Sequence, residues 1–164
     1  MERLWAPWRL EYVQGARANQ CVFCLADASE DEERLVLHRG ERCFIIMNRF
    51  PYSNGHLMVA PLRHVADPGQ LDGAEVAELH RLTMVCRDLL LACCKAQGFN
   101  IGMNLGGIAG AGVAEHLHQH IVPRWLGDTN FMPVLAEVRV IPQHLEATAR
   151  MLREALARGV GEGR

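Results

Sequence analysis

The chain has 164 residues and a mass of 18.3 kDa, with 49% hydrophobic and 22% charged residues and a formal net charge of −2 at pH 7. This balance is typical of a globular domain, so it excludes wholesale disorder and gives no electrostatic reason to expect a nucleic-acid polymer as partner. The longest uncharged apolar run, Leu89 to Cys94, is far shorter than the ~20 residues that a membrane-spanning helix needs, so no membrane partner is expected.

The N-terminal segment is a poor signal peptide, because it has an early acidic residue, Glu2, and no continuous apolar core. The six cysteines are therefore expected in a reducing compartment, as metal ligands, catalytic groups or buried thiols rather than as disulfides. We expect a cytoplasmic protein.

The first ordered elements should be strands of a mainly antiparallel sheet. After the acidic residues 29–33, which we interpret as a solvated turn, apolar stretches occupy residues 35–37, 43–47 and 56–60. Between the second and third stretches, residues 48–55 contain a proline and an Asn-Gly pair, which are typical of a loop.

The next segment changes to helical spacing. Apolar residues recur from Leu79 to Cys93, Asp72 and Glu75 form a possible N-terminal cap, and Gly98 follows Lys95 as a stop. Further strands are expected over residues 100–105 and 116–125, and a last helix should start at Pro142. The predicted fold class is α+β: a mainly antiparallel, five-stranded sheet with one long helix and a C-terminal helix.

Histidines stand at alternate positions in the last expected strand: His116, His118 and His120. On a strand, alternate residues point to the same face, ~6.6–6.8 Å apart along the chain. A structural role for all of them is a poor explanation, because each buried imidazole needs its own partner.

Two chemistries fit this row of imidazoles. In one, the histidines hold a zinc ion that activates water; in the other, one imidazole is a nucleophile and its neighbours orient and protonate. The acidic ligands common in hydrolytic metal sites are sparse here, since only Glu115 adjoins the row. The nearby residues 106–113 are glycine-rich, so their N–H groups could cradle a phosphate, although no P-loop sequence follows.

The triad, followed by Pro123-Arg124-Trp125 and residues 127–131, resembles the histidine triad superfamily of nucleotide hydrolases and transferases, especially its diadenosine tetraphosphate phosphorylase branch. Residues 5–9, 48–61 with His64, and 98–106 support the resemblance, which extends to about residue 150. It implies a single domain over residues 1–164, with a core at about 21–126 and a C-terminal extension over 127–164. It also implies a homodimer.

The resemblance further implies a mechanism and a substrate. His118 would attack the α-phosphate of a dinucleoside polyphosphate such as diadenosine tetraphosphate, and His120 would hydrogen-bond the phosphate region. Water or inorganic phosphate would then break the nucleotidyl-histidine, with phosphorolysis favoured. An imidazole suits this role because its ordinary pKa near 6.5 leaves it neutral at physiological pH. The alternatives are a nucleoside phosphoramidase, an adenylyl-conjugate hydrolase, or a nucleotide-binding regulatory module with little turnover.

Several positions match the family's substrate-binding residues: Val22, Phe23 and Ile46 for the base, Asn48 for the ribose, Asn104, Ala111 and Gly112 for the phosphates, and Trp125 closing the site. Two features depart from the family pattern. Gln119 stands where an apolar residue is usual, and residues 111–113 offer no hydroxyl or amide side chain. By alternation, the Gln119 side chain should face away from the histidines.

A Cys-x-x-Cys pair, Cys21 and Cys24, is half of a structural zinc site, although a redox pair or buried thiols would look the same. The superfamily's zinc-containing members complete such a site with two histidines, and the matching residues here are His64 and His116. His116 would then be a metal ligand, leaving His118 and His120 for the chemistry. No organic cofactor is expected.

Overall fold

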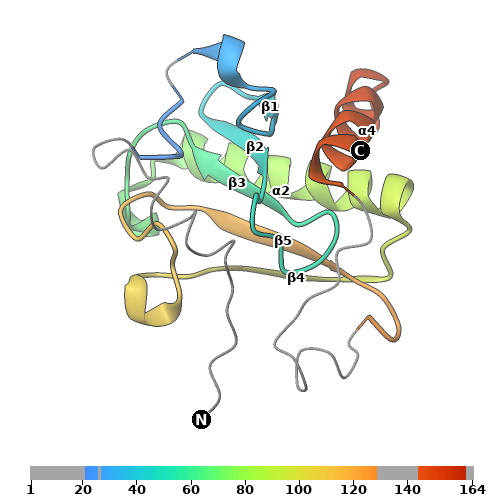
Figure 1. Cartoon of the computed structure of the whole chain (residues 1–164). Coiled ribbons are helices and arrows are strands. Elements are labelled where there is room, and N and C mark those ends of the chain that lie inside the picture. The colour runs from blue at the N-terminus through green and yellow to red at the C-terminus, as the bar shows by residue number, and fades with distance from the viewer. Residues whose placement is uncertain (1–20, 26, 129–143, 162–164) are drawn as a thin grey trace.

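The computed structural model describes residues 21–25, 27–128 and 144–161. Its sheet is antiparallel and five-stranded, and the strands lie in the order β1-β2-β3-β5-β4, as they do from top to bottom in Figure 1. The strands and long helices are β1 (Val36–Arg39), β2 (Cys43–Met47), β3 (Leu57–Pro61), α2 (Gly73–Cys94), β4 (Gly98–Met103), β5 (Gln119–Arg124) and α4 (Leu145–Ala157). The predicted α+β fold is confirmed.

Helix α2 begins at the predicted cap and ends differently from the prediction. The Asp72 carboxylate accepts from the Glu75 backbone N–H at 2.8 Å, and the Glu75 carboxylate accepts from the Asp72 N–H at 2.9 Å, so each end of this capping box satisfies the other. At the C-terminus, Lys95 takes the left-handed conformation with φ 55° and its N–H donates to the Leu90 carbonyl. The chain therefore turns at Lys95, and Gly98 is the first residue of β4 rather than the stop.

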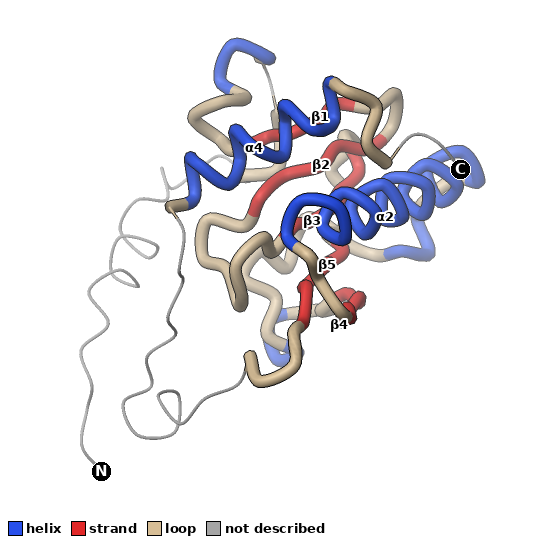
Figure 2. Tube along the Cα trace, turned by 90° about the vertical axis from the view of Figure 1, so that its right-hand side faces the viewer, coloured by secondary structure: helices blue, strands red, loops and turns tan. Residues whose placement is uncertain are grey.

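The two faces of the sheet have different partners. Helices α2 and α4 cover one face, where Ile45 of β2 belongs to the main core cluster (Figure 2). The opposite face holds a smaller cluster with Phe44 of β2. Gln119 belongs to the helix face, since its Nε2 donates to the Thr83 hydroxyl of α2 at 2.8 Å. The prediction that Gln119 faces away from the histidines is confirmed, and the histidines lie on the opposite face.

Strand β5 starts later than predicted. It begins at Gln119, opposite Val59 of β3, whereas the sequence suggested a strand from His116. Leu117 instead donates its N–H to the Val65 carbonyl beyond the end of β3, at 2.6 Å. Only the third histidine of the row, His120, is therefore a residue of the strand itself.

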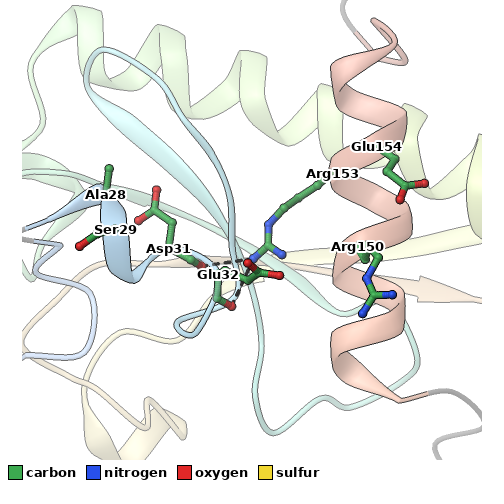
Figure 3. Close-up of a pocket in the computed structure, with 7 residues that line it drawn as sticks. All are labelled: Ala28, Ser29, Asp31, Glu32, Arg150, Arg153 and Glu154. Atoms are coloured by element: carbon green, nitrogen blue, oxygen red, sulfur yellow. Dashed lines mark hydrogen bonds between the residues drawn. The ribbon is translucent and has the colours of Figure 1, made fainter.

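Helix α4 is attached to the β1 edge through an arginine. Arg153 Nε donates to the Val36 carbonyl at 2.9 Å. Its Nη2 donates to the Asp31 carbonyl at 3.2 Å, beside a pocket of about 430 Å³ that both residues line (Figure 3). The helix begins at Leu145, and the predicted start at Pro142 lies outside the described residues. Among the helices of the described ranges, none is both long enough and apolar enough to cross a membrane.

Candidate active site and metal centre

His118 is held with one ring nitrogen available for attack. Its Nδ1 lies 2.8 Å from the His116 backbone carbonyl, which can only accept, so Nδ1 carries the proton and Nε2 carries the lone pair. The residue is 5% exposed, and this burial lowers the pKa of His118 below its ordinary value. His118 is therefore a neutral imidazole at physiological pH, as a nitrogen nucleophile must be.

His120 has the opposite tautomer, and His56 sets it. The Tyr52 backbone N–H donates to His56 Nδ1 at 3.1 Å, so the proton of His56 is on Nε2. That nitrogen lies 2.9 Å from His120 Nδ1 and donates to it, which leaves the His120 proton on Nε2. His120 Nε2 is buried and has no hydrogen-bond partner among the described residues, and a buried donor of this kind needs an acceptor such as a phosphate oxygen.

Burial and the neighbouring His118 also lower the pKa of His120, to about 4. The two rings lie 4.9 Å apart between centroids, at an interplanar angle of 72°. The lone pair of His118 and the N–H of His120 therefore lie in one site. This arrangement suits attack by His118 on a phosphorus atom while His120 donates to one of its oxygens.

Sequence reasoning assigned no role to His56 and missed Tyr52. The Tyr52 ring lies 4.8 Å from the His56 ring and 5.8 Å from the His120 ring, stacked on the latter at 29°. The link from His56 to His120 depends on the pairing of β3 with β5, which places Met58 opposite His120. No local sequence motif indicates that pairing. Only the order of the strands in the sheet could have predicted that His56 contacts His120.

The predicted base-binding residues differ in accessibility. Ile46 and Phe23 lie in the smaller cluster, on the histidine face of the sheet, whereas Val22 is 53% exposed. Phe23 is only 4% exposed, and its ring stacks on His118 at a centroid distance of 4.7 Å. Little of the Phe23 ring is therefore left for contact with a base.

The predicted ribose and phosphate residues are already engaged within the chain. Asn48 accepts from the Phe50 N–H at 2.9 Å, and its amide nitrogen lies 3.3 Å from His56 Nδ1. Asn104 donates to the Gly110 carbonyl at 3.4 Å, and the Ala111 N–H donates to the Gly106 carbonyl at 3.3 Å. These contacts fold the loops that carry the predicted residues.

The glycine-rich loop needs glycine at two of its positions. Gly106 has φ 82° and Gly110 has φ 90°, a conformation that side-chain-bearing residues rarely adopt. Gly112 lies in the same loop, and its role at the phosphates stays a prediction.

Trp125 packs on the helix face of the sheet within this chain. Its indole N–H donates to the Cys94 carbonyl at 3.1 Å, at the C-terminal end of α2, and its side chain packs against the main core on the helix face. Trp125 directly follows β5, whose odd positions share the face of Gln119 and Ile121, and its packing places it on that face, away from His118 and His120. Within this chain, Trp125 therefore does not close the histidine site.

The predicted metal ligands do come together. The ligand atoms of Cys21, Cys24, His64 and His116 all lie within 4.8 Å of one another. The sulfur–nitrogen distances are 3.2 Å from Cys24 to His64, 3.4 Å from Cys21 to His116, and 3.8 Å from Cys24 to His116. A tetrahedral zinc, with bonds of about 2.3 Å to sulfur and about 2.0–2.1 Å to nitrogen, sets such atoms about 3.6 Å apart.

The chemistry of these ligands also suits a metal cation. His116 Nε2 donates to the Pro61 carbonyl at 2.8 Å, which leaves the Nδ1 lone pair directed at the thiols. Burial and the adjacent Cys21 raise the pKa of Cys24. A bound cation would lower that pKa again, because it stabilises the thiolate. These residues fit zinc. In the described part of the chain no other such group occurs, and His118 and His120 are not members of this one.

Comparison with known proteins places this geometry in a family. Residues 29–125 match the HIT domain. The chain belongs to the HIT family. It is 39% identical over 167 residues to a protein named AP-4-A phosphorylase from Mycobacterium tuberculosis, covering 96% of this chain and 86% of that one. With this relative, HIT membership identifies the protein as an enzyme, as predicted.

Solved structures agree with the assignment. A zinc-bound histidine triad family protein from Mycobacterium smegmatis superposes with a TM-score of 0.65 at 28% identity, covering 85% of this chain and 94% of that one. A histidine triad nucleotide-binding protein from Sulfolobus tokodaii gives 0.66 at 26% identity, covering 88% and 99% of the two chains. The five-stranded HIT fold is thus shared along most of the chain.

Proposed function

We propose that the enzyme cleaves dinucleoside polyphosphates, with diadenosine tetraphosphate as the main substrate, through a nucleotidyl-histidine on His118. The observation that carries the proposal is the pair of opposite tautomers: a lone pair on His118 Nε2 beside an N–H on His120 Nε2. The name of the Mycobacterium tuberculosis relative supports the choice of substrate.

In the first step, His118 Nε2 forms a bond to the α-phosphorus, and the bond from that phosphorus to the bridging oxygen breaks. ATP departs with that oxygen, and AMP stays on the imidazole. His120 Nε2–H donates to a phosphate oxygen as negative charge develops on it. In the second step, an oxygen of inorganic phosphate attacks the same phosphorus, the nitrogen–phosphorus bond breaks, and ADP leaves. Water in place of phosphate gives AMP.

The metal centre has a structural role in this proposal. Zinc would be held by Cys21, Cys24, His64 and His116, where it ties the segment of Cys21 and Cys24 to the residues that precede β5. The zinc-bound relative supports the choice of metal. All six cysteines are free, and the proposal places the enzyme in the cytoplasm, a reducing compartment where thiols stay available as ligands.

The partner of the enzyme is a nucleotide rather than a nucleic-acid polymer, and the enzyme is a homodimer. The edge strand β4 supports the second point, because it presents the exposed residues Asn100, Ile101 and Gly102 and, among the described residues, pairs only with β5. Sedimentation analysis of the native protein and of Ile101→Lys tests it: the native protein should sediment as a dimer and the variant as a monomer.

Product analysis tests the reaction. Diadenosine tetraphosphate is incubated with the enzyme, with and without inorganic phosphate, and nucleotides are separated by ion-exchange chromatography. ATP and ADP formed only with phosphate support phosphorolysis, whereas ATP and AMP without phosphate indicate hydrolysis on the same histidine. His118→Ala, which removes the nucleophile, should abolish both. Failure of the native enzyme to cleave this substrate would contradict the proposal.

A further inference from the structure

The side chain packed on the nucleophile comes from between the two metal-binding thiols. Phe23 lies within the Cys21–Cys24 turn, which is closed by a hydrogen bond from the Cys24 N–H to the Cys21 carbonyl at 3.1 Å. Its ring stacks on His118 at 4.7 Å and 30°, and lies 5.5 Å from the His116 ring. The turn that offers the thiols therefore also supplies a wall of the His118 site.

A second contact links the metal ligands to His118 through the backbone. The carbonyl of His116 accepts the His118 Nδ1–H, and the His116 side chain offers its Nδ1 to the thiols. Any movement of His116 on gaining or losing a metal would move that carbonyl. One face of the His118 ring thus depends on the turn that carries two of the metal ligands, and its Nδ1 depends on the metal ligand His116.

Phe23 is poorly placed to be a base-binding residue alone. It is buried in the smaller cluster, where its ring lies 6.5 Å from that of Phe44, and its stacked face is already occupied by His118. The neighbouring Val22 is exposed and gives the turn no anchor in that cluster. Besides Phe23, the side chains of Cys21 and Leu25 pack against this cluster, and the two thiols offer the turn a further anchor when a metal is bound.

We propose that Phe23 is a positioning residue for the nucleophile, and that metal ligation by the four-residue centre fixes it there. With the centre loaded, the Phe23 ring and the His116 carbonyl together hold the His118 ring in one orientation. Without the metal, the turn is released, and His118 samples orientations that do not suit attack. The inference rests on the proposed function for its effect on turnover, but its effect on the His118 ring does not.

The test compares Phe23→Leu with the matched control Phe44→Leu, in protein loaded with one zinc per chain. Both variants remove an aromatic ring from the same cluster, but only the first removes the contact with His118. Phe23→Leu should bind zinc with unchanged stoichiometry and lower kcat about 3- to 10-fold, from a stacking contact of the usual strength. KM should change little, whereas a base-binding role would raise KM and spare kcat.

A second readout does not depend on turnover. In protein labelled with ¹⁵N-histidine, the ring signals of His118, assigned with His118→Gln, should move in Phe23→Leu and on removal of zinc by a chelator. The signals of the exposed His80 on α2 should stay in place. Unmoved His118 signals in either sample would overturn the inference, even if the enzyme cleaves its substrate. Moved signals in both, with no cleavage by the native enzyme, would instead contradict the proposed function alone.

Discussion

The donor role of His120 can be tested through His56, which does not itself reach the substrate in the proposed reaction. His56→Leu removes the N–H that meets His120 Nδ1 at 2.9 Å. With that donor gone, nothing keeps the His120 proton on Nε2, and the donor toward the phosphate is no longer fixed. Hydrogen bonds to charged groups contribute about 1.5–3 kcal/mol, so kcat/KM should fall by roughly 10- to 150-fold.

His56→Gln is the matched control, because a glutamine amide nitrogen can occupy nearly the same position as a histidine Nε2 and still donate. It should retain most of the activity that His56→Leu loses. Both variants are assayed by kcat/KM for diadenosine tetraphosphate at saturating phosphate, and urea unfolding checks that each is folded. Equal activity losses in two folded variants would mean that His56 acts by packing, and full activity in His56→Leu would refute the reasoning from tautomers.

Three further predictions concern pH and stability. Burial and His118 lower the pKa of His120 to about 4. The free energy of unfolding should therefore fall as the pH drops from about 6.5 toward 4, by no more than about 3 kcal/mol. In urea titrations, His120→Gln should lessen this fall. Thr83→Val and Gln119→Leu each break the hydrogen bond between helix and strand, so the double variant should be less destabilised than the sum, with a coupling of about 1 kcal/mol. The hydrogen bonds from Arg63 and from the Asp72 backbone lower the pKa of Glu75 to about 2. The stability that the ionised Glu75 contributes is therefore present above about pH 4.5 and is lost toward pH 2. In thermal unfolding, Glu75→Gln should lower the free energy of unfolding by about 1–2 kcal/mol at pH 7 and by little at pH 2.5.

Local patterns predicted the parts of the fold that local physics determines. The capping box of Asp72 and Glu75 could be read from the sequence because both partners lie within one helical turn. The direction of Gln119 followed from strand alternation, and its partner Thr83 did not, because that contact depends on how α2 crosses the sheet. The role of Trp125 was taken from the resemblance, whereas alternation points to the helix face, where its side chain packs in this chain.

The candidate site divides in the same way. The metal ligands could be matched from the spacing of Cys21 and Cys24 together with a family resemblance, and the structure brings their ligand atoms within 4.8 Å of one another. His56 could not be found, since its role depends on the pairing of β3 with β5. A histidine that acts on another histidine leaves no motif, and only the strand order reveals it.

Equal spacing in sequence does not give the three histidines equal roles. β5 begins only at Gln119, so His116 lies beyond the ladder, where the Pro61 carbonyl takes its Nε2–H and turns its lone pair to the thiols. His118 donates its Nδ1–H to the His116 carbonyl, whereas the Nδ1 of His120 accepts a hydrogen bond from His56. Backbone carbonyls set the tautomers of His116 and His118. The tautomer of His120 is set by His56, whose own tautomer is set by the backbone N–H of Tyr52. Since no side-chain substitution removes a backbone carbonyl, the division into ligand, nucleophile and donor is a property of the fold at this strand end.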